Sequence, residues 1–134
     1  MQFDALNTIN GYLNLYYNSE LISLESLSNL TQVKGTFSID YNDALNSLEG
    51  LLNLTNITGD LDIYSNDALT SLDGLENLAT VGGDVIIRYN YKLSDYCALG
   101  EGVINSISDS SWWSPIYGNS YTSTKDDLIN GDCD

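Results

Sequence analysis

The sequence contains no histidine, and only four of its 134 residues are lysine or arginine. Without histidine, the usual hydrolytic triads and the histidine-bearing metal centres are excluded. Nineteen acidic residues give the chain a formal net charge of −15, which repels the phosphates of nucleic acids and of anionic bilayers. We therefore expect neither nucleic acid nor an acidic membrane surface as a partner.

Long hydrophobic runs are also missing. The apolar residues are spread at short intervals and never approach the roughly 18 consecutive residues of a membrane-spanning helix. The first residues lack the charged stretch and apolar segment that mark a secretory signal. We expect no membrane insertion, and export has to be inferred from other features.

Cysteine is scarce, and both cysteines, Cys97 and Cys133, lie in the last third of the chain. An oxidised pair is the economical interpretation and favours an extracellular or cell-surface location, whereas two unrelated free thiols are the alternative. A metal site needs more ligands than two cysteines provide in a chain without histidine. We predict neither a metal nor a cofactor.

A repeat of 24 residues runs through most of the chain. Ile9, Val33, Ile57 and Val81 recur at this interval, and the two middle units are identical at twelve of 24 positions without an insertion. Self-similarity at a fixed period is the signature of a repeat solenoid. We predict one domain with a solenoid over 1–99 and a C-terminal cap over 100–134. The solenoid divides into a partial repeat and four further units, which are 1–8, 9–32, 33–56, 57–80 and 81–99.

Each unit begins with a predicted strand. Phe37 and Ile39 alternate with outward residues, which is typical of a short strand with one buried face. The same alternation in each unit predicts a parallel sheet along the solenoid. A glycine precedes each strand, where close approach between coils is easiest without a side chain. Leucines spaced by three, such as Leu45, Leu48 and Leu51, then favour extended or 3₁₀ turns over an α-helix.

An asparagine follows every predicted strand. The four residues are Asn18, Asn42, Asn66 and Asn90. A buried side-chain amide at this position can bond the backbone groups that the turn leaves unpaired in its own and the neighbouring coil. We interpret these asparagines as structural.

The stretch FSIDYNDAL matches the core of the leucine-rich repeat, in which alternating apolar residues precede an asparagine and a leucine. With the leucine triplets and the glycine before each strand, it resembles the receptor L domain branch of that family and bacterial surface proteins with the same unit. The resemblance covers roughly residues 3–99 and implies a right-handed, mostly β solenoid with one short parallel strand per repeat and a cap that contains a short helix. It implies little about function, because the matching positions are core and turn positions.

The two ends of the chain differ. Phe3 and Leu6 match the last third of a repeat, so we expect an uncapped N-terminal edge that continues upstream or contacts another chain. After Leu99 the period dissolves into a segment with Trp112 and Trp113, which suits a lid and leaves a ligand platform as the alternative.

The sequence STKDDLING predicts a helix in this cap. Ser123 is the expected N-cap, Asp126 the third helical residue and Gly131 the end. Cys133 then reaches back to Cys97, and such a bridge contributes on the order of 3 to 4 kcal/mol. The proteins that this chain resembles end similarly, with a glycine and a cysteine closing a short helix.

The outward residues of the predicted strands form the candidate binding surface on the concave face of the sheet. Tyrosine is a low-entropy contact residue, and carboxylates suit a basic protein or the hydroxyl groups of a sugar. Cross-strand packing alone is the alternative explanation. The candidate residues are Tyr12, Asn14, Tyr16, Ser38, Asp40, Asp60, Asp62, Tyr64, Asp84 and Arg88, and the next position adds Tyr17, Tyr41 and Tyr89.

Other chemistry is less well supported. Paired carboxylates such as Asp60 and Asp62 could serve a glycosidase, but one must be desolvated, and a flat exposed sheet gives no pocket for this. We predict that the protein is not an enzyme. No calcium-loop motif is present. The sequons at Asn29, Asn53 and Asn56 would accept glycans in a eukaryotic secretory route, or are a by-product of the repeat.

These observations favour a secreted or cell-surface binding or adhesion module that recognises a protein or carbohydrate through the concave face. The alternative is a structural or spacer segment of a longer surface protein, with no ligand of its own.

Overall fold

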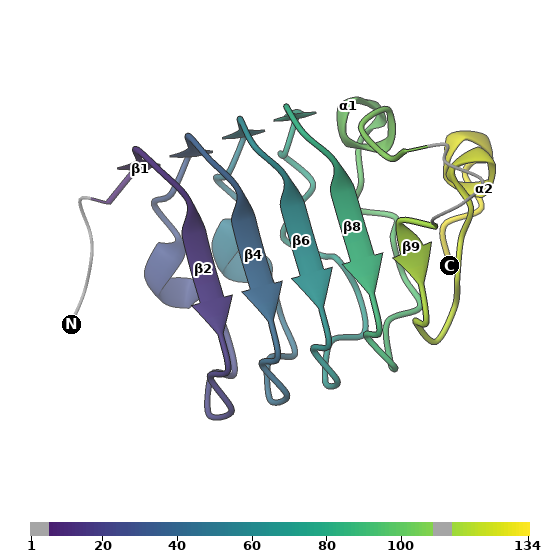
Figure 1. The fold of residues 1–134 in the computed structure, drawn as a ribbon, viewed down its shortest axis with the longest axis horizontal. Helices are drawn as coiled ribbons and strands as arrows, with labels where there is room; N and C mark the ends of the chain where they lie inside the picture. Colours follow the sequence, from purple (N-terminus) through teal and green to yellow (C-terminus); the bar gives the residue numbers. More distant parts are fainter. Residues whose placement is uncertain (1–5, 109–113) are drawn as a thin grey trace.

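The computed structural model describes residues 6–108 and 114–134. The chain winds into successive coils that stack along one axis (Figure 1). The larger of its two sheets, here the main sheet, consists in spatial order of β2 (Leu13–Tyr16), β4 (Phe37–Asp40), β6 (Leu61–Tyr64), β8 (Val85–Arg88) and β9 (Ile116–Tyr117). All its strands pair in parallel, and the first four keep a 24-residue register. The predicted repeat solenoid is therefore confirmed.

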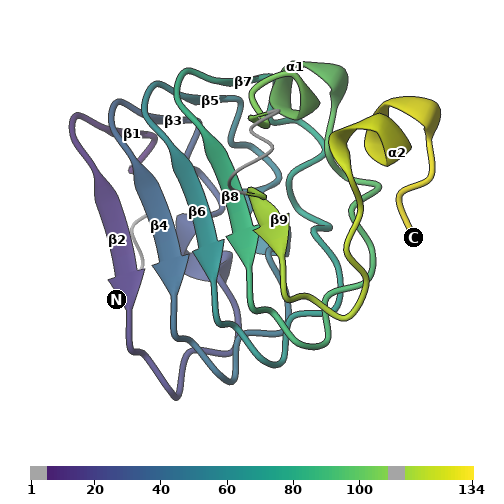
Figure 2. The same ribbon diagram turned by 45° about the vertical axis from the view of Figure 1, so that its right-hand side comes forward.

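Each repeat also contains a second strand that the sequence analysis does not predict. These strands pair in parallel along the upper edge of the coils in Figure 2, and they are β1 (Thr8–Ile9), β3 (Gln32–Val33), β5 (Asn56–Ile57) and β7 (Thr80–Val81). Each has only two residues. A segment this short cannot display the alternation by which a strand is recognised in a sequence.

The core lies between the main sheet and the turns behind it. Inward side chains such as Leu61 and Ile63 meet the leucines spaced by three, such as Leu69 and Leu72, and all four are 0% exposed. Burying one such side chain stabilises the fold by about 2 kcal/mol. Two of the rear turns are the 3₁₀ helices η1 (Glu25–Leu27) and η2 (Glu49–Leu51), as the leucine spacing predicts.

Close stacking of the coils explains the glycine ahead of each strand. A Cβ atom on Gly59 would lie 2.5 Å from the backbone nitrogen of Thr36 in the preceding coil, which is too close for any side chain. The equivalent Gly11, in the first described coil, has no atom of the described residues within 4 Å of such a Cβ. The glycine is therefore required where one coil stacks on another.

The asparagines form a continuous ladder at the turn below the main sheet. Asn42, Asn66 and Asn90 are 0% exposed. The Asn66 side-chain amide donates to the Ile39 carbonyl at 2.8 Å, and its Oδ1 accepts from the Asn42 backbone at 3.2 Å. Each side chain thus pairs backbone groups of a neighbouring coil that would otherwise be buried without partners. The predicted structural role is confirmed.

The cap continues this pattern beyond the recognisable repeats. β9 pairs with β8, Ile87 opposite Ile116, and the Asn119 side chain accepts from the Asn90 backbone at 2.9 Å. The segment that ends at Asn119 therefore acts as a fifth coil, spaced by 29 residues instead of 24. The five additional residues hide this coil from a search at a fixed period. Trp112 and Trp113 lie outside the described residues, as does Phe3.

Two short helices complete the cap, α1 (Glu101–Ile104) and α2 (Lys125–Asn130). The predicted N-cap, Ser123, is wrong by one residue. Thr124 caps α2 in a capping box with Asp127, whose backbone N–H donates to the Thr124 hydroxyl. Gly131 ends the helix in a left-handed conformation, as expected. No helix in the part of the chain that the structure describes is long and apolar enough to cross a membrane.

A disulfide joins Cys97 to Cys133, with 5.0 Å between the two Cα atoms, and confirms the predicted bridge. The contact is reinforced by Tyr96, whose backbone N–H donates to the Cys133 carbonyl at 2.8 Å. The fully buried Tyr96 ring stands where earlier repeats have leucine, and its hydroxyl donates to the Tyr121 carbonyl at 2.6 Å. The last repeat is thus tied to the cap covalently and through one tyrosine.

Candidate functional site

The outward side chains of the main sheet, here the sheet face, include most of the residues that the sequence singles out. Tyr12 is 72% exposed and Tyr16 48%, while Asn14 and Asp84 are also exposed. Asp60, Asp62, Tyr64 and Arg88 are half-buried. These residues lie side by side on one surface, as the strand alternation predicts.

Ser38 and Asp40 differ from the expectation of an exposed surface. Ser38 is 3% exposed and Asp40 8%. β4 lies between two strands with larger outward side chains, so that Asp40 stands in register between Tyr16 and Tyr64. The burial of an outward side chain on β4 depends on the side chains of β2 and β6 beside it, so the sequence of one strand does not reveal it.

The last outward position of each strand forms a row across the sheet that alternates rings with charged groups. The row runs Tyr16, Asp40, Tyr64, Arg88 and Tyr117. The Arg88 guanidinium donates to the Ser114 carbonyl in the cap, so this cation is directed away from Asp40. About 9 to 10 Å separates β4 from β8, since neighbouring strands lie about 4.8 Å apart.

The residue after each strand adopts an unusual backbone conformation. Tyr17, Tyr41, Ser65 and Tyr89 have φ angles of 54°, 57°, 51° and 56°, in the left-handed region that costs an ordinary residue on the order of 1 kcal/mol or more. Only the cap has a glycine here, Gly118. The turn requires this conformation in every coil, and three of the four repeats place a tyrosine there nonetheless.

The tyrosines of the row and of the turns contact one another in a continuous ladder. Tyr17 and Tyr41 stack with ring centroids 4.6 Å apart and an interplanar angle of 6°. Tyr64 joins at 5.3 Å from Tyr41 and 5.2 Å from Tyr89, and Tyr89 lies 5.7 Å from Tyr117. Ring pairs at these separations contribute about 0.5 to 1.5 kcal/mol each beyond the area that they bury. The ladder therefore extends from the first described coil to the cap.

A shallow hollow of about 380 Å³, here the tyrosine hollow, opens in this ladder. Its lining residues come from two strand ends and two turns, and they are Tyr16, Tyr17, Asp40, Tyr41 and Tyr64. Asp40 is the one carboxylate among them. Acid–base glycoside hydrolysis uses two carboxyl groups, so the hollow does not supply that arrangement.

The Asp40 carboxyl group is electrostatically unusual. Burial is the main cause that raises its pKa to about 6, and the nearby charge of Asp62 raises it further. Hydrogen bonds with the Tyr16 side chain and the Tyr64 backbone partly oppose this increase. Its Oδ1 atom is buried and has no hydrogen-bond partner among the described residues. Such a buried, unpaired acceptor is costly and requires an explanation.

Asp62 and Tyr41 are shifted in the same direction. Burial and the neighbouring Asp60 raise the pKa of Asp62, while Arg88 opposes the shift. A side-chain hydrogen bond with Tyr64 is the first cause that raises the pKa of Tyr41. Burial and neighbouring charges thus disfavour ionisation of Asp62, and the raised pKa keeps the Tyr41 hydroxyl protonated at neutral pH.

Comparison with known families adds an independent observation. Residues 31–96 match the family model described as Receptor L domain. The matched repeats fit a receptor L domain-like fold. No curated protein and no solved structure matches the chain. The matched residues include β4 and β6, from which Asp40 and Tyr64 project.

The receptor L domain-like repeats also account for the sequon at Asn53. The Asn53 side-chain amide donates to the Ser28 carbonyl at 2.7 Å. Asn77, one repeat later, makes the equivalent bond to the Leu52 carbonyl at 2.8 Å, although the sequence around it is not a sequon. Asparagine at this position therefore serves the rear turn whether or not a threonine follows.

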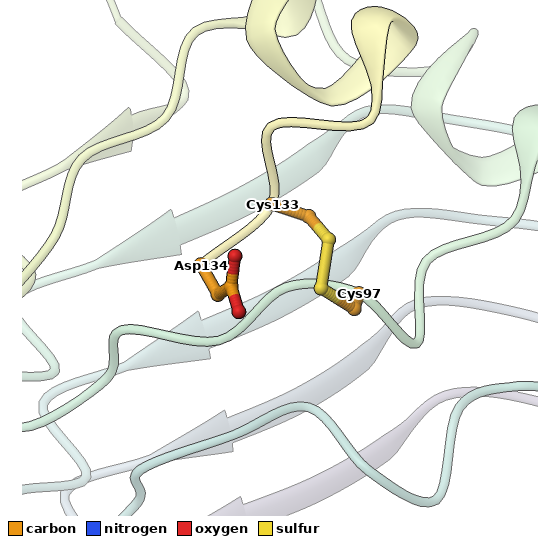
Figure 3. Close-up of side chains that lie close together, drawn as sticks. All are labelled: Cys97, Cys133 and Asp134. Atoms are coloured by element: carbon orange, nitrogen blue, oxygen red, sulfur yellow. A yellow bond between two sulfur atoms is a disulfide. The ribbon is translucent and has the colours of Figure 1, made fainter.

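The cap contains the other features that could be mistaken for a site. Cys97, Cys133 and Asp134 lie close together (Figure 3), with candidate ligand atoms within 4.8 Å of one another. Both sulfur atoms are in the disulfide, so neither is the thiolate that binds a metal. A larger hollow of about 690 Å³ is lined by Ser108 and Ser114, which flank a segment outside the described residues.

Sequence reasoning found Tyr17, Tyr41 and Tyr89 but missed Tyr91 and Tyr117. Tyr91 lies 6.5 Å from Tyr89 between ring centroids. Tyr117 stands in the hidden fifth coil, and the signal that could have found it is the similarity of Ile87–Asn90 to 116–119, each with isoleucine first and asparagine last. A search that allowed an insertion would have aligned the two.

Proposed function

We propose that this protein is an extracellular binding module that recognises a protein or a glycan through the sheet face. The receptor L domain match and the disulfide are both consistent with an extracellular ligand-binding module. The tyrosine hollow carries the proposal further, since a shallow aromatic depression with a buried carboxylate resembles the anchor pockets at which interface energy is concentrated. We further propose that 1–99 form the binding solenoid and 100–134 its cap, without a catalytic role.

The ladder of tyrosines supports recognition over mere packing. The turn rings lie on the outer surface and not in the core, since Tyr17 is 75% exposed and Tyr41 38%. Exposed tyrosine supplies contact area to a partner at a low cost in side-chain entropy. Three tyrosines also occupy left-handed backbone positions where asparagine would fold with less strain, which points to a role of the rings themselves.

A triple substitution tests the proposal. Replacing Tyr16, Asp62 and Tyr64 by alanine should abolish binding to arrayed extracellular proteins and glycans that capture the unaltered protein. The melting temperature should fall by several degrees, because Tyr64 loses two ring contacts, but the variant should still fold, since none of the three side chains belongs to the apolar core. Leu52→Ser is the control. Leu52 is 43% exposed behind the sheet, so this substitution should leave capture unchanged.

The alternative is a spacer segment without a ligand. Capture that the triple variant retains in full would exclude the sheet face as the binding surface. A protein that binds nothing in either array would support the spacer.

A further inference from the structure

We infer that the tyrosine hollow takes a basic side chain of a protein partner, and that Asp40 is the acceptor for its N–H groups. This inference rests on the proposed function and names the chemistry of the partner at one point of the sheet face. The hollow is lined by four tyrosines and one carboxylate. Aromatic faces attract cations, and a carboxylate completes the site for a cation that carries hydrogen-bond donors.

The unpaired atom of Asp40 decides between a cation and a neutral ligand. Asp40 is 8% exposed, and its Oδ1 has no partner in the described part of the chain. The other contacts on this carboxyl come from Tyr16 and from the Tyr64 backbone. A buried acceptor is most favourably completed by a charged donor, because a hydrogen bond with an ionised group on each side is about twice as strong as a neutral one.

Arg88, the nearest cation of the sheet face along this row, does not complete the site. It lies two strands away with Tyr64 between, and its guanidinium donates to the Ser114 carbonyl. The carboxylates of Asp40 and Asp62 are part of the formal net charge of −15, which attracts a basic partner from a distance. A quaternary ammonium would satisfy the rings but leave Oδ1 unpaired.

Entry of the side chain requires a small rearrangement. Oδ1 lies beneath neighbouring side chains, but Tyr16 is 48% exposed and its ring can rotate on a timescale of nanoseconds. An arginine guanidinium then stacks on a tyrosine ring and directs its planar N–H groups to the carboxylate. A lysine ammonium uses the same two features with less area of contact.

Peptide titration tests the inference without knowledge of the partner. The probes are pentapeptides with acetylated and amidated ends, in which glycines flank a central arginine, lysine, acetyl-lysine or glutamate. Binding is measured through the NMR chemical shifts of the protein's backbone amides. We expect the arginine and lysine peptides to shift the amides of Tyr17, Tyr41 and Ser65, with a dissociation constant of about 1 mM or weaker for a single side chain. The acetyl-lysine and glutamate peptides should not shift them.

Two pairs of variants locate the site. Asp40→Asn should raise the dissociation constant of the arginine peptide by about tenfold or more. Asp84→Asn removes an exposed carboxylate of the same face, and it should change this dissociation constant by no more than about twofold. Tyr64→Leu should weaken binding of the arginine peptide. Tyr12→Leu should not, because Tyr12 precedes β2 and does not line the hollow. Neither asparagine variant removes a core side chain, and a thermal melt verifies that each one folds.

The pH dependence provides a separate readout. Binding requires ionised Asp40, whose pKa is raised to about 6 by burial. Binding of the arginine peptide should therefore be lost as the pH falls from 7 to 5. The groups that face Asp40 are Tyr16 from β2, Tyr41, and Asp62 with Tyr64 from β6. The pKa of Asp62 is raised as well. In Asp40→Asn the loss of binding at low pH should disappear, which distinguishes titration of Asp40 from titration of Asp62.

Equal binding of the acetyl-lysine and arginine peptides, or unchanged binding in Asp40→Asn, would overturn the inference. Tetramethylammonium binding with the same affinity as the arginine peptide would also overturn it. A glycan that binds the hollow in preference to every peptide also contradicts it, while leaving the proposed function of the sheet face intact. Absence of any capture by the unaltered protein in the array experiment, in contrast, is a failure of the proposed function.

Discussion

At the scale of the residue, Asp40 combines a cost in stability with a place in the candidate site. Its pKa of about 6 in the folded protein lies above the value of about 3.9 in an unfolded chain. The folded state therefore holds a proton that the unfolded state releases between about pH 4 and pH 6. Stability falls as pH rises through this window, and the full cost is present above it.

Asp40→Asn should consequently stabilise the protein near neutral pH. We expect a gain in the free energy of unfolding on the order of 2 kcal/mol at pH 7.5 and little gain at pH 3.5, because Asp40 is mostly protonated in both states there. Urea unfolding of both proteins at the two pH values measures the difference, with Asp84→Asn as the control. An equal gain at both pH values would contradict the assigned pKa shift.

Gly59 is the residue at which stacking between coils is most easily tested. Gly59→Ala places a Cβ 2.5 Å from the Thr36 nitrogen, so the coils must separate, and we expect a loss of about 2 to 3 kcal/mol. Gly11→Ala, at the equivalent position without a preceding described coil, should change stability by less than about 1 kcal/mol. Similar losses in the two variants would show that the glycine serves backbone conformation and not stacking.

At the scale of the element, the asparagine ladder is what holds the turns of successive coils together. Asn66→Ala leaves the Ile39 carbonyl and the Asn42 N–H buried without partners. We expect a loss of about 3 kcal/mol, since each such group costs about 1 to 3 kcal/mol.

Asn18→Ala is the matched control for the ladder. Asn18 is exposed, and its amide donates to Tyr16 and Asn42, so we expect a loss of about 1 kcal/mol or less. Chemical denaturation of both variants measures the comparison. If the two losses are equal, burial does not explain the strength of the ladder.

The elements also show what the sequence could predict and where it failed. The four-residue strands and the asparagine ladder follow from spacing, because each depends on one repeated position. The bridge between Cys97 and Cys133 follows from the presence of only two cysteines. The two-residue strands and β9 were missed, since they are too short or displaced by five residues. The hollow was missed for a different reason: the burial of Asp40 depends on its neighbours on β2 and β6, which one strand does not reveal.

At the scale of the whole molecule, the cap and the binding surface are separate. The disulfide closes a loop with a sequence separation of 36 residues, and the tyrosine hollow is lined by residues of β2, β4 and β6 and of the turns after β2 and β4. Figure 1 shows these strands on the side of the solenoid away from the C-terminus. Replacing Cys97 and Cys133 by serine should lower the free energy of unfolding by about 3 to 4 kcal/mol. Binding of the arginine peptide should be unchanged in the folded variant, and a loss of both properties would contradict this separation.

The sheet face as the binding surface is the central claim, and site-specific photocross-linking measures it most directly. Benzoylphenylalanine at Tyr12, 72% exposed on the sheet face, is compared with the same probe at Leu52, 43% exposed behind the sheet. With extracellular proteins from its source as the target, we expect the Tyr12 probe to capture one discrete partner and the Leu52 probe to capture none. Capture of that partner at Leu52 alone, or equally at both positions, would contradict it.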